Sequence, residues 1–273
     1  MSVTLAEATA VIHELWPLSG AEAWDASGLV SGDPASTVES ILLAVDAVAD
    51  TVDEAIEADA DLLLVHHPLL LRGVTSVAED RYKGALLARL IRADCALLAA
   101  HTNADVVENG VSDMLAQRLG LVDTQPITVS SAPGTGIGRV GRLAQPTTLG
   151  QLARRLAELL PATASGVRVA GDYTSRVETV SLCGGAGDSL LGHPLVRGSD
   201  VYVTSDLRHH PASESREQAK AAGSGPALID VSHWASEWLW LDTAAEQLRQ
   251  ALPGVVVTVS ELRTDPWDFV ITQ

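Results

Sequence analysis

The sequence contains few cysteines and no long apolar run. Its 273 residues include two cysteines, Cys95 and Cys183, which excludes a disulfide framework and a cysteine-rich zinc module and fits a reducing compartment. No uninterrupted apolar run approaches the ~18–20 residues that a membrane span needs. The first 18 residues contain no Lys or Arg, so they do not resemble a secretory signal. We therefore expect a cytoplasmic protein.

Basic residues are also scarce. There are 18 Lys and Arg against 35 Asp and Glu, a formal net charge of -17. Residues 1–71 contain 13 acidic and no basic side chains, whereas residues 139–220 contain 10 basic and 8 acidic ones. Nucleic acids and anionic membranes bind clusters of Lys and Arg. We therefore expect neither as a partner, and we expect any anionic substrate to bind within 139–220.

Apolar strands alternate with amphipathic helices along the chain. Continuously apolar strands of this kind predict parallel or mixed sheets covered by helices, an α/β fold. A Ser/Gly/Pro-rich segment, 129–138, predicts a turn or linker, and we expect one α/β domain at 1–128 with 226–273 and a second at 129–225. The expected strands are 41–45, 62–65, 95–99, 139–143, 167–170, 177–182, 201–204, 227–231 and 255–259; the expected helices are 3–15, 50–60, 82–92, 111–119, 149–160, 212–222 and 233–250.

Histidines and carboxylates follow three of these strands directly. In open α/β sheets, ligands bind beyond the carboxyl ends of strands. The positions concerned are His66 and His67 after 62–65, His101 and Asp105 after 95–99, and His233 and Glu237 after 227–231.

The spacing of these side chains suits metal coordination. His233 and Glu237 are four residues apart, which places both on one helix face. His66 and His67 are adjacent, and Pro68 helps to end the strand so that both rings can turn toward one cavity. Three histidines and two carboxylates exceed one tetrahedral zinc site and suit two metal ions that share a carboxylate bridge.

Each feature also has a structural explanation. His233 and Glu237 are compatible with an ordinary polar helix turn, and the three nearby tryptophans with core packing. The glycine-rich segment 183–189 lacks the lysine of a phosphate-binding loop and is better explained as a turn. A buried thiol is the default for Cys183. We expect structural or surface roles for His13, His193, His209 and His210.

Several motifs together resemble one family. They are WDASGL at 24–29 with GDP at 32–34, VHHPL at 65–69, HTNAD at 101–105, LCGGAG at 182–187, TSDLRHH at 204–210 and DVSHWASE at 230–237. This ordered set is similar to the NIF-three-like dinuclear metal-centre family, whose bacterial members are labelled GTP cyclohydrolase I type 2 homologues. Ala26-Ser27, Ala104 and Trp234 depart from the family pattern, and none of these changes removes a ligand.

The resemblance implies a fold and a metal centre. It implies two α/β domains of similar build, a dimetal site in the cleft between them and often a hexameric ring. Some family members carry an inserted middle domain, which this chain is expected to lack. His101 corresponds to a histidine close to the metals, either as a proton carrier or as a support for a ligand. The implied metal ligands are His66, His67, Asp105, His233 and Glu237.

The resemblance also implies an activity. It is a hydrolase with two zinc, iron or manganese ions, in which a metal-activated water attacks C8 of a guanine nucleotide on the route to dihydroneopterin triphosphate. The triphosphate would bind basic or backbone donors of the middle domain, including Arg208. Two alternatives remain open: a non-enzymatic metal-binding ring scaffold, and a dimetal phosphoesterase or amidohydrolase with another substrate.

Overall fold

The structure is a computed structural model that describes residues 3–130 and 134–272. Its contacts divide the chain into two compact units. Unit 1 comprises Met1–Ala104 and Leu241–Thr264, and unit 2 comprises Asp105–Trp240 and Asp265–Gln273. Within the described residues, no helix is long and apolar enough to cross a membrane.

Unit 1 is built on a five-stranded sheet. The strand order is β15-β4-β5-β6-β2, in which β15, β4, β5 and β6 are parallel and β2 is antiparallel to β6. The inner strands are buried along almost their whole length because they carry Leu, Val, Ile and Ala at nearly every position. The bounds are β2 (Gly28–Ser31), β4 (Ser40–Ala44), β5 (Leu62–Val65), β6 (Ala96–Ala99) and β15 (Val256–Val259); β1 (Val3–Thr4) pairs separately with β3 (Thr37–Val38).

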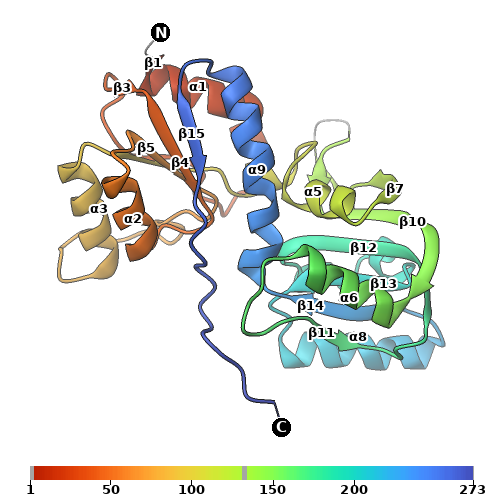
Figure 1. Cartoon of the computed structure of the whole chain (residues 1–273). Coiled ribbons are helices and arrows are strands. Elements are labelled where there is room, and N and C mark those ends of the chain that lie inside the picture. The colour runs from red at the N-terminus through yellow and green to blue at the C-terminus, as the bar shows by residue number, and fades with distance from the viewer. Residues whose placement is uncertain (1–2, 131–133, 273) are drawn as a thin grey trace. The chain divides into compact units, whose positions relative to one another are not determined.

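Helices cover both faces of this sheet (Figure 1). α2 (Ala49–Glu57) and α3 (Tyr82–Arg92) lie on one face and close a core with the alternate side chains of β4, β5 and β6. α1 (Leu5–Leu15) lies on the other face and begins with a capping box, in which Thr4 and Glu7 satisfy each other's backbone N–H groups. Two short elements complete the unit, η1 (Leu18–Gly20) and the single turn α4 (Thr102–Asp105).

Unit 2 is built on a six-stranded mixed sheet. The order is β11-β14-β13-β12-β10-β7, with β12, β13 and β14 parallel and the outer strands antiparallel to their neighbours. A small hairpin of β8 (Thr128–Val129) and β9 (Gly136–Ile137) lies between β7 and β10 in the sequence. The bounds of the sheet strands are β7 (Leu121–Gln125), β10 (Arg139–Thr148), β11 (Arg168–Ala170), β12 (Arg176–Ala186), β13 (Val201–Ser205) and β14 (Ala227–Val231).

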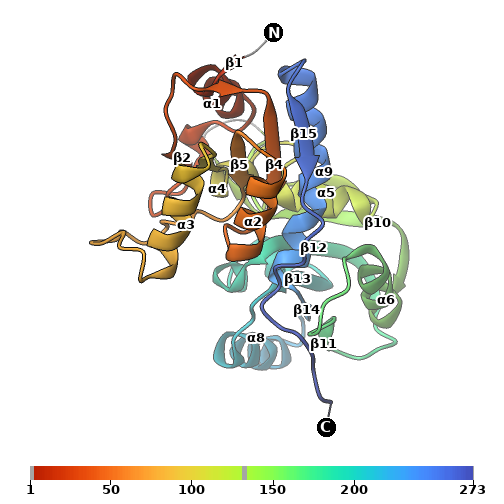
Figure 2. The same cartoon turned by 60° about the vertical axis from the view of Figure 1, so that its left-hand side comes forward.

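The helices of unit 2 differ in how deeply they pack. α5 buries most of its residues, including Met114 and Leu115, and packs on β10 and β12, whereas α8 buries none of its 14 residues. α9 begins in unit 2, and its residues from Leu241 onward belong to unit 1. The bounds are α5 (Val111–Arg118), α6 (Leu149–Leu159), η2 (Asp188–Leu190), α7 (Pro194–Arg197), α8 (His209–Ala222) and α9 (His233–Ala251), which Figure 2 shows from a second direction.

The predicted α/β class with parallel and mixed sheets is confirmed, but the units divide the chain at other positions than expected. The boundaries follow Ala104 and Trp240 because β7 and β14 both pair into the sheet of unit 2. The segment expected to be a linker, 129–138, lies within unit 2, where its described ends form the β8–β9 hairpin; positions 131–133 lie outside the described residues.

Candidate metal centre

The paired histidines follow β5 without a break in the strand ladder. The His66 N–H donates to the Ala44 carbonyl at 3.1 Å, and the His67 N–H donates to the Val45 carbonyl at 2.8 Å. Backbone pairing with the chain after β4 therefore fixes both residues. His66 is buried, with 1% of its surface exposed, and His67 is half-buried.

The two rings and that of His101 form a triangle in unit 1. The ring centroids of His66 and His67 are 5.2 Å apart, those of His66 and His101 5.2 Å, and those of His67 and His101 5.7 Å. Each ring offers one nitrogen such that all three nitrogens lie within 4.8 Å of one another. Three imidazole nitrogens this close together could hold one metal ion.

Hydrogen bonds at Nδ1 orient all three rings. A carbonyl or carboxylate oxygen only accepts, so each Nδ1 carries the hydrogen and each Nε2 keeps the lone pair with which a neutral histidine binds a metal. The accepting atoms are the Ala100 carbonyl oxygen for His66 at 2.8 Å, Asp46 Oδ1 for His67 at 2.7 Å and Asp25 Oδ1 for His101 at 2.7 Å.

Asp25 is the most heavily bonded of these acceptors. It also receives hydrogen bonds from the backbone N–H and the hydroxyl of Thr102 and from the hydroxyl of Ser27. Burial by itself would raise the pKa of Asp25, but the bonds from His101 and Thr102 outweigh burial and hold this pKa far below its usual value. Asp25 is therefore a buried anion that fixes the orientation of His101.

An exposed tryptophan adjoins the triangle. Trp24 is 60% exposed, and its ring meets that of His101 edge-on with centroids 5.8 Å apart. The chain beside it is anchored because the Glu22 N–H donates to the Thr102 hydroxyl at 2.9 Å and the Ala26 N–H donates to Asp25 at 2.6 Å. A large aromatic surface is thus held in place next to the histidines without being covered.

In unit 2, the first turn of α9 places His233 against Glu237. The Ser232 hydroxyl accepts from the Ala235 N–H at 3.1 Å and caps the helix. His233 Nε2 then lies 2.9 Å from Glu237 Oε1, and His233 Nδ1 lies 2.7 Å from Asp206 Oδ2. Burial would lower the pKa of His233, but the charges and hydrogen bonds of Glu237 and Asp206 raise it to about 11. Glu237 and Asp206 thus hold the His233 ring from both of its nitrogens.

A glycine cradles this pair. Gly185, near the end of β12, has φ +65°, and a Cβ added to it would lie 2.4 Å from Glu237 Oε1 and 3.2 Å from His233 Nε2. Its N–H donates to the Ser236 hydroxyl at 2.9 Å. Only glycine lets the backbone approach the two side chains this closely.

Asp105 is the fifth predicted ligand. It ends α4 and is half-buried. Within unit 2 it lies near enough to Cys183 to raise the pKa of that thiol: burial is the main cause, Asp105 the next, and Glu237 also contributes, giving about 12. Cys183 is thus an inert, protonated core residue.

The remaining sequence candidates have structural roles or are exposed. His193 caps α7 by accepting from the Leu195 N–H at 3.3 Å. His209 and His210 lie exposed at the start of α8, with ring centroids 5.3 Å apart. Arg208, considered for phosphate binding, donates to Asp188, with Nε at 2.9 Å from the carboxylate.

Sequence reasoning assigned no site role to four residues. Asp25, Asp46 and Asp206 orient the three half-exposed histidines, and Gly185 cradles Glu237. Asp25, Asp206 and Gly185 lie inside the motifs that carried the resemblance, and Asp46 directly follows the predicted strand 41–45. Their roles depend on contacts between distant segments, which spacing along the chain does not reveal.

Comparisons with known proteins match the chain over nearly its whole length. The family model Duf34/NIF3 (NGG1p interacting factor 3) matches residues 3–266. A Streptomyces coelicolor protein named "GTP cyclohydrolase 1 type 2 homolog" is 47% identical over 270 residues, covering 96% of this chain and 93% of the relative. A Mycobacterium tuberculosis protein of the same name is 35% identical over an alignment of 377 residues, covering 98% of each chain.

Solved structures share the fold. A hypothetical protein from Staphylococcus aureus superposes with a TM-score of 0.86 at 26% identity, and a Bacillus cereus protein related to NIF3 with 0.89 at 22% identity. Each comparison covers 98% of this chain and 99% of the other. With the family model matching 264 consecutive positions, from 3 to 266, and a relative at 47% identity, the chain belongs to the DUF34/NIF3 family.

Proposed function

We propose that this protein is a dinuclear metal-dependent hydrolase of the GTP cyclohydrolase I type 2 kind. The observation that carries the proposal is the histidine triangle of unit 1, in which every Nδ1 is engaged by an oxygen and every Nε2 keeps its lone pair. Metal-binding histidines are held in this way, with the second ring nitrogen donating to a carbonyl or carboxylate.

The donor atoms fit divalent transition metals. Imidazole nitrogen and carboxylate oxygen suit zinc, iron(II) and manganese, and the chemistry of the donors does not choose among them. Unit 1 offers His66 and His67, and unit 2 offers His233, Glu237 and Asp105. Neither set alone completes two coordination spheres, so we propose that the five residues together would hold two ions. Gly185 supports this, because it keeps the space around Glu237 and His233 clear.

Two further residues of unit 1 have the chemistry that such a reaction needs. Ions bound to these ligands would lower the pKa of a water molecule toward neutrality. His101 lies beside these ligands with its ring oriented by the buried Asp25 carboxylate, so it would be placed to act as a proton carrier. Trp24 offers an exposed aromatic face on which a planar heterocycle can stack beside His101.

The proposed substrate is a guanine nucleotide, by extension from the name of the relatives and from the aromatic wall that Trp24 forms. We also propose a homo-oligomer, a hexameric ring of about 170 kDa given a chain of 28.6 kDa. Light scattering of the purified protein measures this mass directly.

Metal counting combined with turnover tests the proposal. Metal per chain is measured by elemental analysis, and metal-loaded and chelator-stripped samples are assayed on GTP, on a phosphodiester and on a cyclic amide. We expect two ions per chain and metal-dependent turnover of GTP. Turnover of only the phosphodiester or only the amide would mean that the substrate belongs to that class and is not a guanine nucleotide. Full metal occupancy without turnover on all three classes would favour the scaffold over the enzyme.

A further inference from the structure

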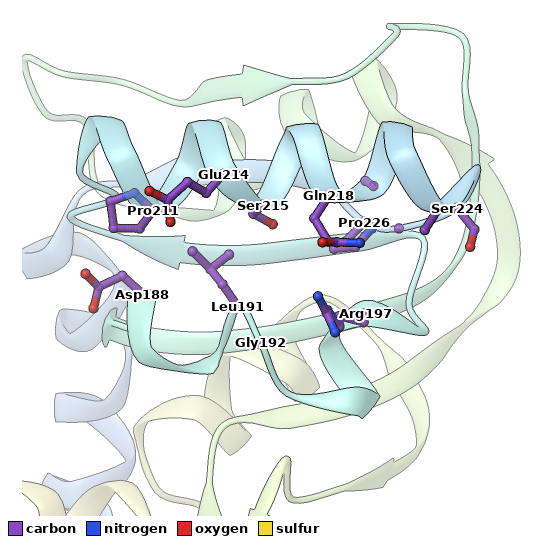
Figure 3. A pocket seen from close by; sticks show the side chains of 13 residues that line it. Asp188, Leu191, Gly192, Arg197, Pro211, Glu214, Ser215, Gln218, Ser224 and Pro226 are labelled. Carbon is purple, nitrogen blue, oxygen red and sulfur yellow. The ribbon is translucent and has the colours of Figure 1, made fainter.

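Unit 2 contains a pocket of about 530 Å³ to which no predicted metal ligand contributes. One wall is α8 with the turn that follows it, and the other is the segment from η2 to α7 (Figure 3). The volume lies within the ~300–1,000 Å³ of small-molecule sites.

The pocket has charges of opposite sign at its two ends. Asp188 and Glu214 lie at one end and Arg197 at the other, with the apolar Leu191 between them (Figure 3). Asp188 is neutralised by Arg208. Neither Glu214 nor the Arg197 guanidinium makes an ion pair or a side-chain hydrogen bond within residues 3–130 and 134–272. One anion and one cation therefore face the same pocket without contacting each other.

Two polar residues of α8, one turn apart, line the pocket. Gln218 lies at the Arg197 end of the pocket, four residues after Glu214 along the helix. Four residues of α-helix span about 6 Å. An extended dipeptide spans about 7 Å between its amino and carboxyl groups, which is close to the rise between Glu214 and Gln218.

A triphosphate fits this pocket less well. The lining contains a single cation, Arg197, and two carboxylates, so several phosphate charges would meet no matching set of donors. A ligand with one positive and one negative end meets a side chain of opposite charge at each end, Glu214 and Arg197.

We propose that this pocket is a binding site for a short peptide with free ends, a dipeptide or close analogue. Its carboxylate pairs with Arg197 beside Gln218 and Ser224, its ammonium pairs with Glu214, and an apolar side chain packs on Leu191. The site is separate from the proposed metal centre and does not depend on it.

The dipeptide Ala-Leu tests the proposal in a saturation-transfer NMR titration of the full chain, with and without a chelator. We expect a dissociation constant on the order of 1 mM, unaffected by metal. Gly192→Phe should abolish binding, because Gly192 lines the pocket and a side chain there meets no atom within 4 Å, so it projects into the open space. Gly73→Phe is the matched control: it is also unobstructed but lies in unit 1, and it should bind Ala-Leu normally.

Charge variants identify the two ends. Arg197→Gln should weaken the binding of Ala-Leu about tenfold and leave the binding of Ala-Leu amide, which lacks the carboxylate, unchanged. Glu214→Gln should likewise weaken the binding of Ala-Leu about tenfold and leave the binding of N-acetyl-Ala-Leu, which lacks the ammonium, unchanged. Absence of saturable Ala-Leu binding, or equal binding by Gly192→Phe, overturns the site. Tighter binding of inorganic pyrophosphate than of Ala-Leu in this pocket overturns the dipeptide assignment.

Discussion

The two units supply their parts of the proposed metal centre in different ways. In unit 1, three histidines come from two strand ends, and their orienting oxygens come from other segments of the fold. In unit 2, one turn of α9 supplies both His233 and Glu237. The orienting carboxylates differ as well, since the Asp25 side chain is 0% exposed and that of Asp206 is 60% exposed.

This difference shows where each part is vulnerable. The triangle of unit 1 depends on buried hydrogen bonds, which lose much of their value when one partner is removed. The pair of unit 2 depends on helix geometry and on the space that Gly185 leaves. Substitutions of matched residues in the two units can therefore separate the two kinds of support.

The largest effect is expected from removing the paired histidines of unit 1. The double variant His66→Ala/His67→Ala should lose bound metal and metal-dependent turnover together, because two nitrogen ligands disappear. His209→Ala/His210→Ala is the matched control, an adjacent and exposed pair on α8, and it should retain both. Elemental analysis and the turnover assay measure this. Turnover retained by a metal-free first variant would contradict the proposed centre.

The next effect concerns the cradle in unit 2. Gly185→Ala places a Cβ 2.4 Å from Glu237 Oε1 and should weaken metal binding about 10- to 100-fold, as loss of a supporting contact does. Gly166→Ala is the control for backbone strain, because Gly166 has a similar φ of +58° and no atom within 4 Å of an added Cβ. Both should lose about 1–2 kcal/mol of stability. Equal metal affinity in the two variants would show that the cradle is unimportant.

Substitution of the orienting carboxylate should have a larger effect in unit 1, at Asp25, than in unit 2, at Asp206. Asp25→Asn should lower metal affinity about 10- to 100-fold, because Asp25 orients the His101 ring that lies against the proposed ligands His66 and His67. It should also lower Tm, because a buried anion with donors from His101 and Thr102 is replaced by an amide. Asp206→Asn changes an exposed side chain, so we expect less than a tenfold effect and an unchanged Tm. Competition with a chelator and thermal unfolding provide the two measurements. The reverse order would mean that exposure does not set the strength of this support.

The smallest effect concerns one cysteine in each unit. Burial raises the pKa of Cys95 to about 11 and that of Cys183 to about 12, from a usual 9.0. Because only the thiolate reacts, neither should be alkylated in the native protein at pH 8, and both should react once unfolded. The folded state binds the thiol protons more tightly than the unfolded state does. The contribution of the two thiols to the free energy of unfolding is therefore constant below about pH 9 and falls as the pH rises toward 11. Rapid native alkylation of Cys183 before Cys95 would contradict this order.

Much of the fold was predictable from local patterns. Every predicted helix and strand from 3–15 to 255–259 overlaps an element of the same type, because apolar runs and helical periodicity report burial directly. The missed strands are short or lie at edges. β7 has one buried residue of five and a left-handed residue, Asp123, so its pattern carries no burial signal. That omission also displaced the expected domain boundary, since β7 pairs with β10.

The candidate site was predictable only in part. Strand-end positions predicted His66, His67, His101, His233 and Glu237 as site residues, because strand polarity places such residues at one edge of a sheet. The structure groups the first three in unit 1 and the last two in unit 2. The partners of those histidines were not predictable, since Asp25 and His101 are 76 positions apart and meet only in the folded chain. The same holds for Gly185, which the sequence alone presents as part of an ordinary glycine-rich turn.

The shallow packing of α8 has a consequence for motion. A helix that buries none of its 14 residues loses little apolar contact when it opens, so the free energy of its local opening is small compared with that of global unfolding. Its amide hydrogens should exchange with solvent well before those of the buried strand β13, which precedes it in unit 2. A ligand that joined Glu214 to Arg197 would restrain α8 and slow this exchange.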